Sequence, residues 1–210
     1  MSRHRDFRAA ALAALLLLGG GRLVGAGAAE DADWPCVQRK VPEISAGMVW
    51  AGPPIGDADR AAWREDPAIA DLAQRLAARG VPAEADEAAV AEFAAAAGSD
   101  KDRKLTLLFA GILDTINGER ADILAGIERY AKRQRALAEK LELQAAELDA
   151  LPVDGTAAQQ ARRAELAEMQ AWDTRIFDNR ERSLSYVCEK PVQLEQRVFA
   201  LARVLMAHLD

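Results

Sequence analysis

Cys36, Cys188 and His208 carry the side chains of this 210-residue chain that are best suited to redox or metal chemistry. The sequence has no other cysteine, and an even pair in an oxidising compartment predicts a disulfide bond. Two free or metal-bound thiols are the alternative, although neither cysteine has a ligand-like neighbour. His208 falls in step with the apolar positions of the last predicted helix, so we interpret it as a helix-end residue. No CxxCH or HExxH motif and no histidine cluster is present, and we therefore expect no metal and no cofactor.

The densest polar stretch lies between residues 172 and 182, where carboxylates alternate with guanidinium groups. Asp173, Arg180 and the ring of Trp172 could line a groove, although ordinary i,i+4 salt bridges explain the same charges. Because no base, nucleophile or oxyanion-binding device can be assembled here, we expect no catalytic residue. The predicted ligand or partner surface is formed by Trp172, Asp173, Arg180 and Tyr186.

The first 29 residues have the three parts of a secretory signal peptide. Arginines at positions 3, 5 and 8 precede the apolar run 9–18, and Gly27-Ala28-Ala29 provides the small residues that signal peptidase prefers. A membrane anchor is the alternative, but the apolar run is shorter than the roughly 20 residues that cross a bilayer. We therefore expect cleavage that leaves Ala29 or Glu30 at the mature N-terminus, and a periplasmic location.

Removal of residues 1–29 would take away four arginines and one aspartate, which changes the net charge from −6 to −9. An acidic chain without a basic tract is poorly suited to nucleic acid and is not attracted to anionic lipid. No second apolar segment is long enough to span a membrane, so no span is expected after cleavage. The remaining residues are enough for one domain with a core.

The elements that must position these residues are helices, and we predict an all-α helical bundle. Residues 30–66 form a proline- and tryptophan-rich irregular arm, because each proline removes a backbone donor and restricts the residue before it. Residues 67–210 form the helical domain, since caps, glycine stops and apolar spacing repeat along them. The expected helices cover 67–79, 84–97, 101–116, 118–151, 157–188 and a last segment that begins at Pro191.

A long antiparallel hairpin is expected over residues 118–188. Its first helix repeats apolar residues in alternating steps of four and three, a pattern typical of a coiled coil. The short turn at 152–155 requires the next helix to run antiparallel. Gln134 and Gln144 interrupt the seam. They should face Asp, Arg or solvent if the seam packs only within the chain, or lie in a covered groove if another helix also binds. The seam residues are Ile123, Ile127, Tyr130, Gln134, Leu137, Leu141, Gln144, Leu148 and Leu151.

Two short motifs resemble segments of small exported bacterial helical proteins. They are Trp-Pro-Cys-x-Gln at 34–38 and Val-Trp-Ala-Gly-Pro at 49–53, and the resemblance extends to residues 172–191. The resemblance implies an exported helical product and implies no activity.

Three functions compete at this point. The first is a non-catalytic periplasmic interaction or assembly protein that binds an unidentified protein partner, or itself, through the hairpin. The second is a helical bundle that binds a small apolar or cationic molecule in a pocket near Trp172 and Tyr186. The third is an enzyme that uses only carboxylates and arginine. Quenching of tryptophan fluorescence by a ligand would favour the second, and copurification with a defined partner would favour the first.

Overall fold

The computed structural model describes residues 34–80 and 83–210, which belong to one compact unit, Asp31–Asp210. Within these residues every regular element is a helix, so the all-α prediction is confirmed. The predicted signal peptide, residues 1–29, lies outside the described residues. The elements are α1 (Ala46–Val49), α2 (Asp57–Ala62), α3 (Pro67–Ala77), α4 (Ala83–Ala96), a 3-10 turn η1 (Gly98–Asp100), α5 (Lys101–Ala150) and α6 (Ala157–Met206).

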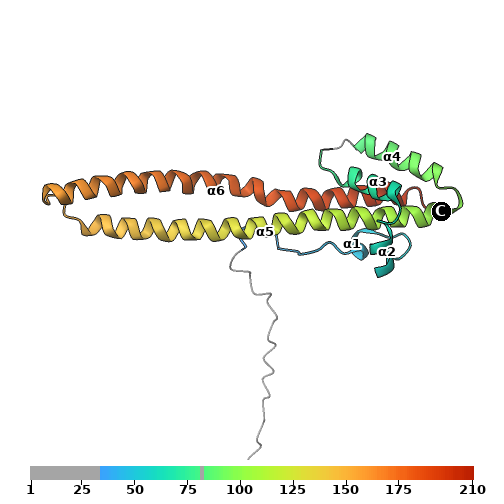
Figure 1. Ribbon diagram of the computed structural model, residues 1–210, viewed down its shortest axis with the longest axis horizontal. Coiled ribbons are helices and arrows are strands. Elements are labelled where there is room, and N and C mark those ends of the chain that lie inside the picture. The colour runs from blue at the N-terminus through green and yellow to red at the C-terminus, as the bar shows by residue number, and fades with distance from the viewer. Residues whose placement is uncertain (1–33, 81–82) are drawn as a thin grey trace, which may run out of the picture. The chain divides into compact units, whose positions relative to one another are not determined.

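Helices α5 and α6 form the antiparallel hairpin, and each contains 50 residues, about 75 Å of helix (Figure 1). The hairpin therefore extends well beyond the expected range of 118–188. The expected interruption at Asn117-Gly118 does not occur, because the Asn117 amide bonds the backbone of the arm and Gly118 keeps a helical conformation. The expected new start at Pro191 is also wrong. Pro191 lies buried inside α6, where packing of the same helix face continues through it.

Local signals at the hairpin turn explain why the two helices separate at residue 151. The Thr156 hydroxyl accepts a hydrogen bond from the Gln159 amide at 3.3 Å, and the Gln159 side chain accepts one from the Thr156 amide at 2.8 Å, a capping box. Arg163 donates from α6 to the carbonyls of Leu148 and Leu151 at 2.7 and 2.9 Å. These bonds satisfy carbonyls that the end of α5 leaves without helical partners.

Helices α3 and α4 begin and end within two residues of the bounds that the sequence predicts. The Asp66 carboxylate accepts from the amides of Ala68 and Ile69, and Pro67 is the first residue of α3. Gly80 follows α3 with φ of 81°, and Gly98 follows α4 with φ of 61°, conformations that favour glycine. The arm is less irregular than expected, because α1 and α2 lie within it.

The core surrounds the end of the hairpin opposite the turn. In Figure 1, α1 and α2 lie along one side of that end and α3 and α4 along the other, and α3 packs on both long helices. Trp50 stacks on Phe109 with ring centroids 4.4 Å apart. The apolar side chains buried on the two long helices here include Leu105, Leu108, Phe109, Ile112, Ile116, Leu194, Val198, Leu201 and Leu205.

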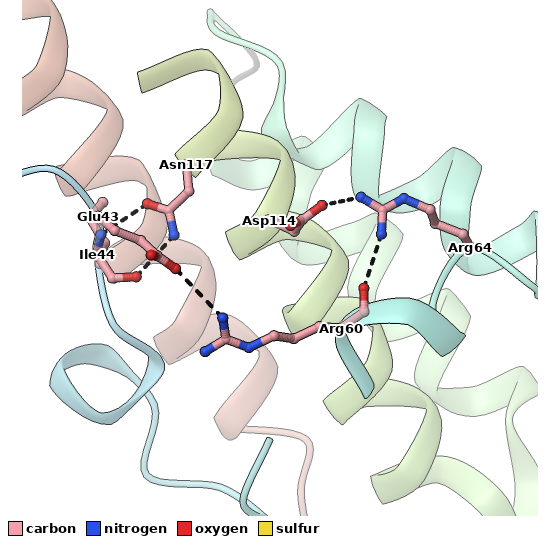
Figure 2. A network of polar contacts seen from close by, with 6 residues as sticks. All are labelled: Glu43, Ile44, Arg60, Arg64, Asp114 and Asn117. Carbon is pink, nitrogen blue, oxygen red and sulfur yellow. Dashed lines mark hydrogen bonds and ion pairs between the residues drawn. The ribbon is translucent and has the colours of Figure 1, made fainter. Parts of the chain in front are cut away.

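Close approach of helices requires glycine at one position of α5. A Cβ atom at Gly111 would lie 2.9 Å from the Trp63 ring and 3.0 Å from Cβ of Ala73. Arg64 beside that ring forms an ion pair with Asp114, so α2 is held to α5 by packing and by charge (Figure 2). The structure thus uses the smallest residue where two neighbouring elements meet α5.

We distinguish two parts of the hairpin. The basal half comprises residues 101–127 of α5 and 187–206 of α6, and the distal half comprises 128–150 and 157–186. The shorter helices pack against the basal half, whereas in the distal half no other helix lies beside α5 and α6, and only the start of the arm contacts them (Figure 1). No helix among the described residues is long and apolar enough to cross a membrane.

Candidate functional site

The predicted disulfide is present. Cys36 and Cys188 are bonded with Cα atoms 5.6 Å apart, so the first described residues of the arm are joined to α6 across 152 positions of sequence. Cys188 is buried, and both cysteines are taken up by this bond. The structure thus favours the disulfide over the alternative of free or metal-bound thiols. Among the described residues, no cluster of three or more histidine, cysteine or acidic side chains could hold a metal ion.

Polar contacts then hold the arm along α5. The Asn117 amide bonds the backbone of Ile44 in both directions, accepting from its N–H and donating to its carbonyl at 3.0 Å each (Figure 2). Glu43 and Arg60 form an ion pair at 3.7 Å beside these bonds. The backbone of Ile44 is therefore held by a side chain that supplies both a donor and an acceptor.

A buried arginine makes the second polar contact between the arm and α5. The Arg120 guanidinium donates to the Val41 carbonyl, and its burial lowers the pKa of Arg120. Nearby, Lys40 forms an ion pair with Glu128. Residue numbers fall along α5 as they rise along the arm, so the arm runs antiparallel to α5.

Asp173, one of the predicted site residues, is buried between the two long helices. Its Oδ2 atom lies 2.7 Å from Nζ of Lys140 and accepts a hydrogen bond from Gln144 at 2.8 Å. The bond to Lys140, with a second contribution from Gln144, lowers the pKa of Asp173. The carboxylate is therefore charged at neutral pH, and its contacts join α5 to α6.

Gln134 occupies a similar place nearer the middle of the hairpin. Its amide nitrogen donates to the Phe177 carbonyl at 3.0 Å and to Glu181 at 3.1 Å, while its buried oxygen has no hydrogen-bond partner. Both seam glutamines therefore meet α6 of the same chain. Gln144 faces an aspartate, as expected for packing within the chain, but both glutamines are covered rather than lying at an open edge.

The other three predicted site residues do not gather at one place. Trp172 is 62% exposed with Arg175 over its ring, and Tyr186 is 62% exposed with Lys190 over its ring. Trp172 and Tyr186 are 14 residues apart on one helix, about 21 Å along its axis. The backbone carbonyl of Arg180 accepts a hydrogen bond from the Tyr130 hydroxyl.

The apolar spacing of the sequence predicts six residues for the inner face of α6: Leu166, Met169, Trp172, Ile176, Leu184 and Val187. Leu166, Leu184 and Val187 do lie along the seam, but between them the prediction is one residue out of step. Asp173 and Phe177 lie against α5 there, and Met169 and Trp172 are exposed. The residues of α6 that form this seam are spaced alternately four and three positions apart, and that spacing is visible in the sequence. The α6 members of the seam are Leu166, Gln170, Asp173, Phe177, Arg180, Leu184, Val187, Pro191, Leu194, Val198, Leu201 and Leu205.

Burial of the seam differs sharply between the two halves of the hairpin. In the distal half Leu137, Leu141 and Leu148 are only half-buried, although they occupy seam positions. Four distal residues are buried, and three of them are polar: Leu166, Gln134, Gln144 and Asp173. Leu143 and Trp172 are exposed on the outer surface of the same half. The distal half therefore presents apolar side chains that no element of the described chain covers.

A groove beside the disulfide was not expected from the sequence. It has a volume of about 280 Å³, and its walls are the side chains of Trp34, Pro35, Tyr130, Phe177 and Leu184. Gln134, Arg135 and Glu181 supply its polar groups. We call this site the arm groove, because Trp34 and Pro35 close one side of it. Neither Trp172 nor Tyr186 lines it.

His208 lies just beyond the last residue of α6 and is half-buried, in agreement with its interpretation as a helix-end residue.

No protein-family model matches this chain, and comparisons with the curated proteins and with the solved structures found no significant match.

Proposed function

We propose that this chain is an exported, non-catalytic interaction or assembly protein that acts in the periplasm and binds a helical partner through the distal half of its hairpin. The partner is another protein or a second copy of the chain. The signal-peptide pattern of residues 1–29 and the bond between Cys36 and Cys188 support the location, because disulfides persist in oxidising compartments.

The observation that carries the proposal is the incomplete cover of the distal seam. Helices with an apolar stripe must bury it against another element to be stable. In the basal half, additional helices complete that burial, whereas Leu137, Leu141 and Leu148 are only partly buried in the distal half. Two helices side by side leave the edges of their common seam open, and a third helix would cover one of these edges.

Exposed apolar residues on the outer surface add to this surface. Leu143 is 73% exposed and Trp172 62% exposed, and Met169 lies one turn from Trp172 on α6. Tryptophan is over-represented among the residues that contribute most to protein interfaces. Contiguous patches of exposed apolar groups mark interaction surfaces in soluble proteins.

The polar stretch 172–182 supports a structural role rather than catalysis. Asp173 is bonded to Lys140 and Gln144, and Asn179 accepts from Arg182. Arg175 lies over the Trp172 ring. Each of these groups has a partner that stabilises the hairpin, which is the behaviour of a charged helix surface.

Site-specific photocrosslinking in the native bacterium tests the proposal. A photoreactive residue replaces Leu143 in the distal half, and a second variant carries it at Phe199 as the basal control. Each full chain is expressed for export. We expect one defined crosslinked product from position 143 and none from position 199. The product should disappear when Trp172→Asp is combined with the probe, because the charge would disrupt an apolar interface.

Light scattering distinguishes the two kinds of partner. A concentration-dependent dimer of the purified chain, abolished by Trp172→Asp, identifies a second copy, and a monomer with a discrete heterologous crosslink identifies another protein. A monomer at every concentration that gives no crosslink from any distal position would contradict the proposal.

A further inference from the structure

We infer that the arm groove binds a small organic cation, a molecule with an ammonium group and a compact aromatic or aliphatic body. This inference is independent of the proposed partner surface. The groove lies at the disulfide end of the distal half, between the arm and the hairpin, and neither Leu143 nor Trp172 contributes to it.

The size and the walls of the groove suit a small ligand with an apolar body. Its volume of about 280 Å³ is near the lower end of the range for small-molecule sites. Trp34, Tyr130 and Phe177 bring three aromatic side chains to it. The Tyr130 hydroxyl already donates to the Arg180 carbonyl, so the ring rather than the hydroxyl is available to a ligand.

Gln134 forms a fixed part of the groove wall. Its side chain is 8% exposed, and its nitrogen donates to the Phe177 carbonyl and to the Glu181 carboxylate. Its oxygen is enclosed by the protein without a hydrogen-bond partner, so a ligand in the groove does not reach it. The bond from Gln134 therefore helps to hold the Glu181 carboxylate at the groove.

Charge also favours a cation. Glu181 lines the groove, and its carboxylate accepts one hydrogen bond from Gln134, which leaves further acceptor capacity. Aromatic faces attract ammonium groups through their quadrupoles. Arg135 is the cation of the groove, and it has an interaction partner within the chain. The groove thus combines aromatic side chains with a carboxylate, which together attract an ammonium group.

The disulfide holds one wall of the site in place. Trp34 and Pro35 directly precede Cys36, and the next contact of the arm with the hairpin that involves a charged side chain is made by Lys40. Without the bond to Cys188, this end of the arm would lose its covalent attachment. We therefore expect the affinity of the groove to depend on the oxidised state of the cysteines.

The test uses three probes that share a phenyl ring and differ in charge: phenethylammonium, 2-phenylethanol and 3-phenylpropionate. Binding to the oxidised full chain is measured by calorimetry and by tryptophan fluorescence. We expect phenethylammonium to bind with a Kd of about 1 mM, a value that ligands of this size can reach. The alcohol should bind about ten-fold more weakly, since it lacks the charge that the aromatic faces and the carboxylate attract.

Variants then locate the binding. Ala138→Trp fills the groove from α5 and should abolish binding, whereas Met48→Leu, on the exposed surface of α1 outside the groove, should leave it unchanged. Glu181→Gln keeps the acceptor for Gln134 but removes the charge, and should weaken phenethylammonium about five-fold without affecting the alcohol. Circular dichroism confirms that each variant is folded.

Three results would overturn the inference. The first is phenylpropionate binding as tightly as phenethylammonium, which would make Arg135 the dominant group. The second is equal affinity for the cation and the alcohol, and the third is binding that survives Ala138→Trp. A failure of any of these tests leaves the crosslinking result at position 143 unaffected, so the two proposals can fail separately.

Discussion

The basal and distal halves of the hairpin share one seam but differ in what surrounds it. In the basal half, α1 to α4 cover the two long helices, and seam residues such as Ile127 and Leu201 are fully enclosed. In the distal half the same alternation of four and three residues leaves Leu141 partly exposed, and three of the four buried residues are polar. The heptad pattern therefore specifies which face meets the partner helix, while the number of surrounding layers determines how deeply that face is buried.

The largest expected effect comes from one substitution made in both halves. Leu108→Ala should lower the free energy of unfolding by about 3–5 kcal/mol, because it creates a cavity among enclosed side chains. Leu141→Ala should cost about 1 kcal/mol, because solvent already reaches this residue. Urea unfolding followed by circular dichroism measures both. Equal losses would show that the distal half is covered in solution and would remove the distinction between the halves.

Loss of the disulfide should have the next largest effect. The Cys36→Ser/Cys188→Ser variant opens a loop of 152 residues and should lose about 2–4 kcal/mol of unfolding free energy. Hydrogen exchange should increase in residues 34–45 and remain unchanged in α3, which has its own contacts with α5. Faster exchange in α3 as well would mean that the disulfide stabilises the basal core directly.

Substitutions at two glycines of α5 distinguish the effect of packing against neighbouring elements from the effect of helix propensity. Gly111→Ala should destabilise by about 1–3 kcal/mol, because the new methyl group meets the Trp63 ring and Ala73. Gly118→Ala should stabilise by about 0.5–1 kcal/mol, since no atom lies within 4 Å of the new Cβ. Thermal unfolding of both variants checks these opposite signs. A stabilising Gly111→Ala would show that α2 and α3 pack less closely than described.

The smallest expected effect is a pH dependence of the unfolding free energy that arises from Asp173 in the distal half. Lys140 and Gln144 hold the pKa of Asp173 below its usual value of about 3.9, so this carboxylate stabilises the fold fully above that pH. The contribution is lost as pH falls through the lowered pKa of the folded state. Asp173→Asn should therefore lose less stability than the wild type between pH 6 and pH 2.5, measured by urea unfolding. Identical pH profiles would exclude Asp173 as a contributor.

Much of the fold was predictable because it depends on local signals. The Asp66-Pro67 cap, the glycine after α3 and the short turn after α5 each determine an element boundary within a few residues. The disulfide followed from the cysteine count and the expected compartment. The length of the hairpin was not predictable in this way. Asn117-Gly118 and Pro191 are local helix breakers, and contacts with distant residues offset their cost.

The candidate site was predicted less completely. Asp173 and Arg180 were expected to belong to a ligand or partner surface, yet Asp173 lies in the seam because Lys140 and Gln144 satisfy it there. A single sequence does not show that a buried aspartate has such partners, so the apolar residues next to it indicated the wrong face. The arm groove was beyond prediction, since it depends on where Trp34 is placed beside α6, some 150 positions later in the chain.

The position of the disulfide also determines how the chain bears mechanical force. Tension applied between residues 34 and 210 passes from Cys36 directly to Cys188 and then through the last part of α6. The covalent path stretches to roughly 85 Å, compared with roughly 600 Å for the same chain without the bond. The distal half and all of α5 lie inside the closed loop and are not part of the covalent path that bears the load. A pull that unravels the end of α6 therefore leaves the distal helices in their hairpin.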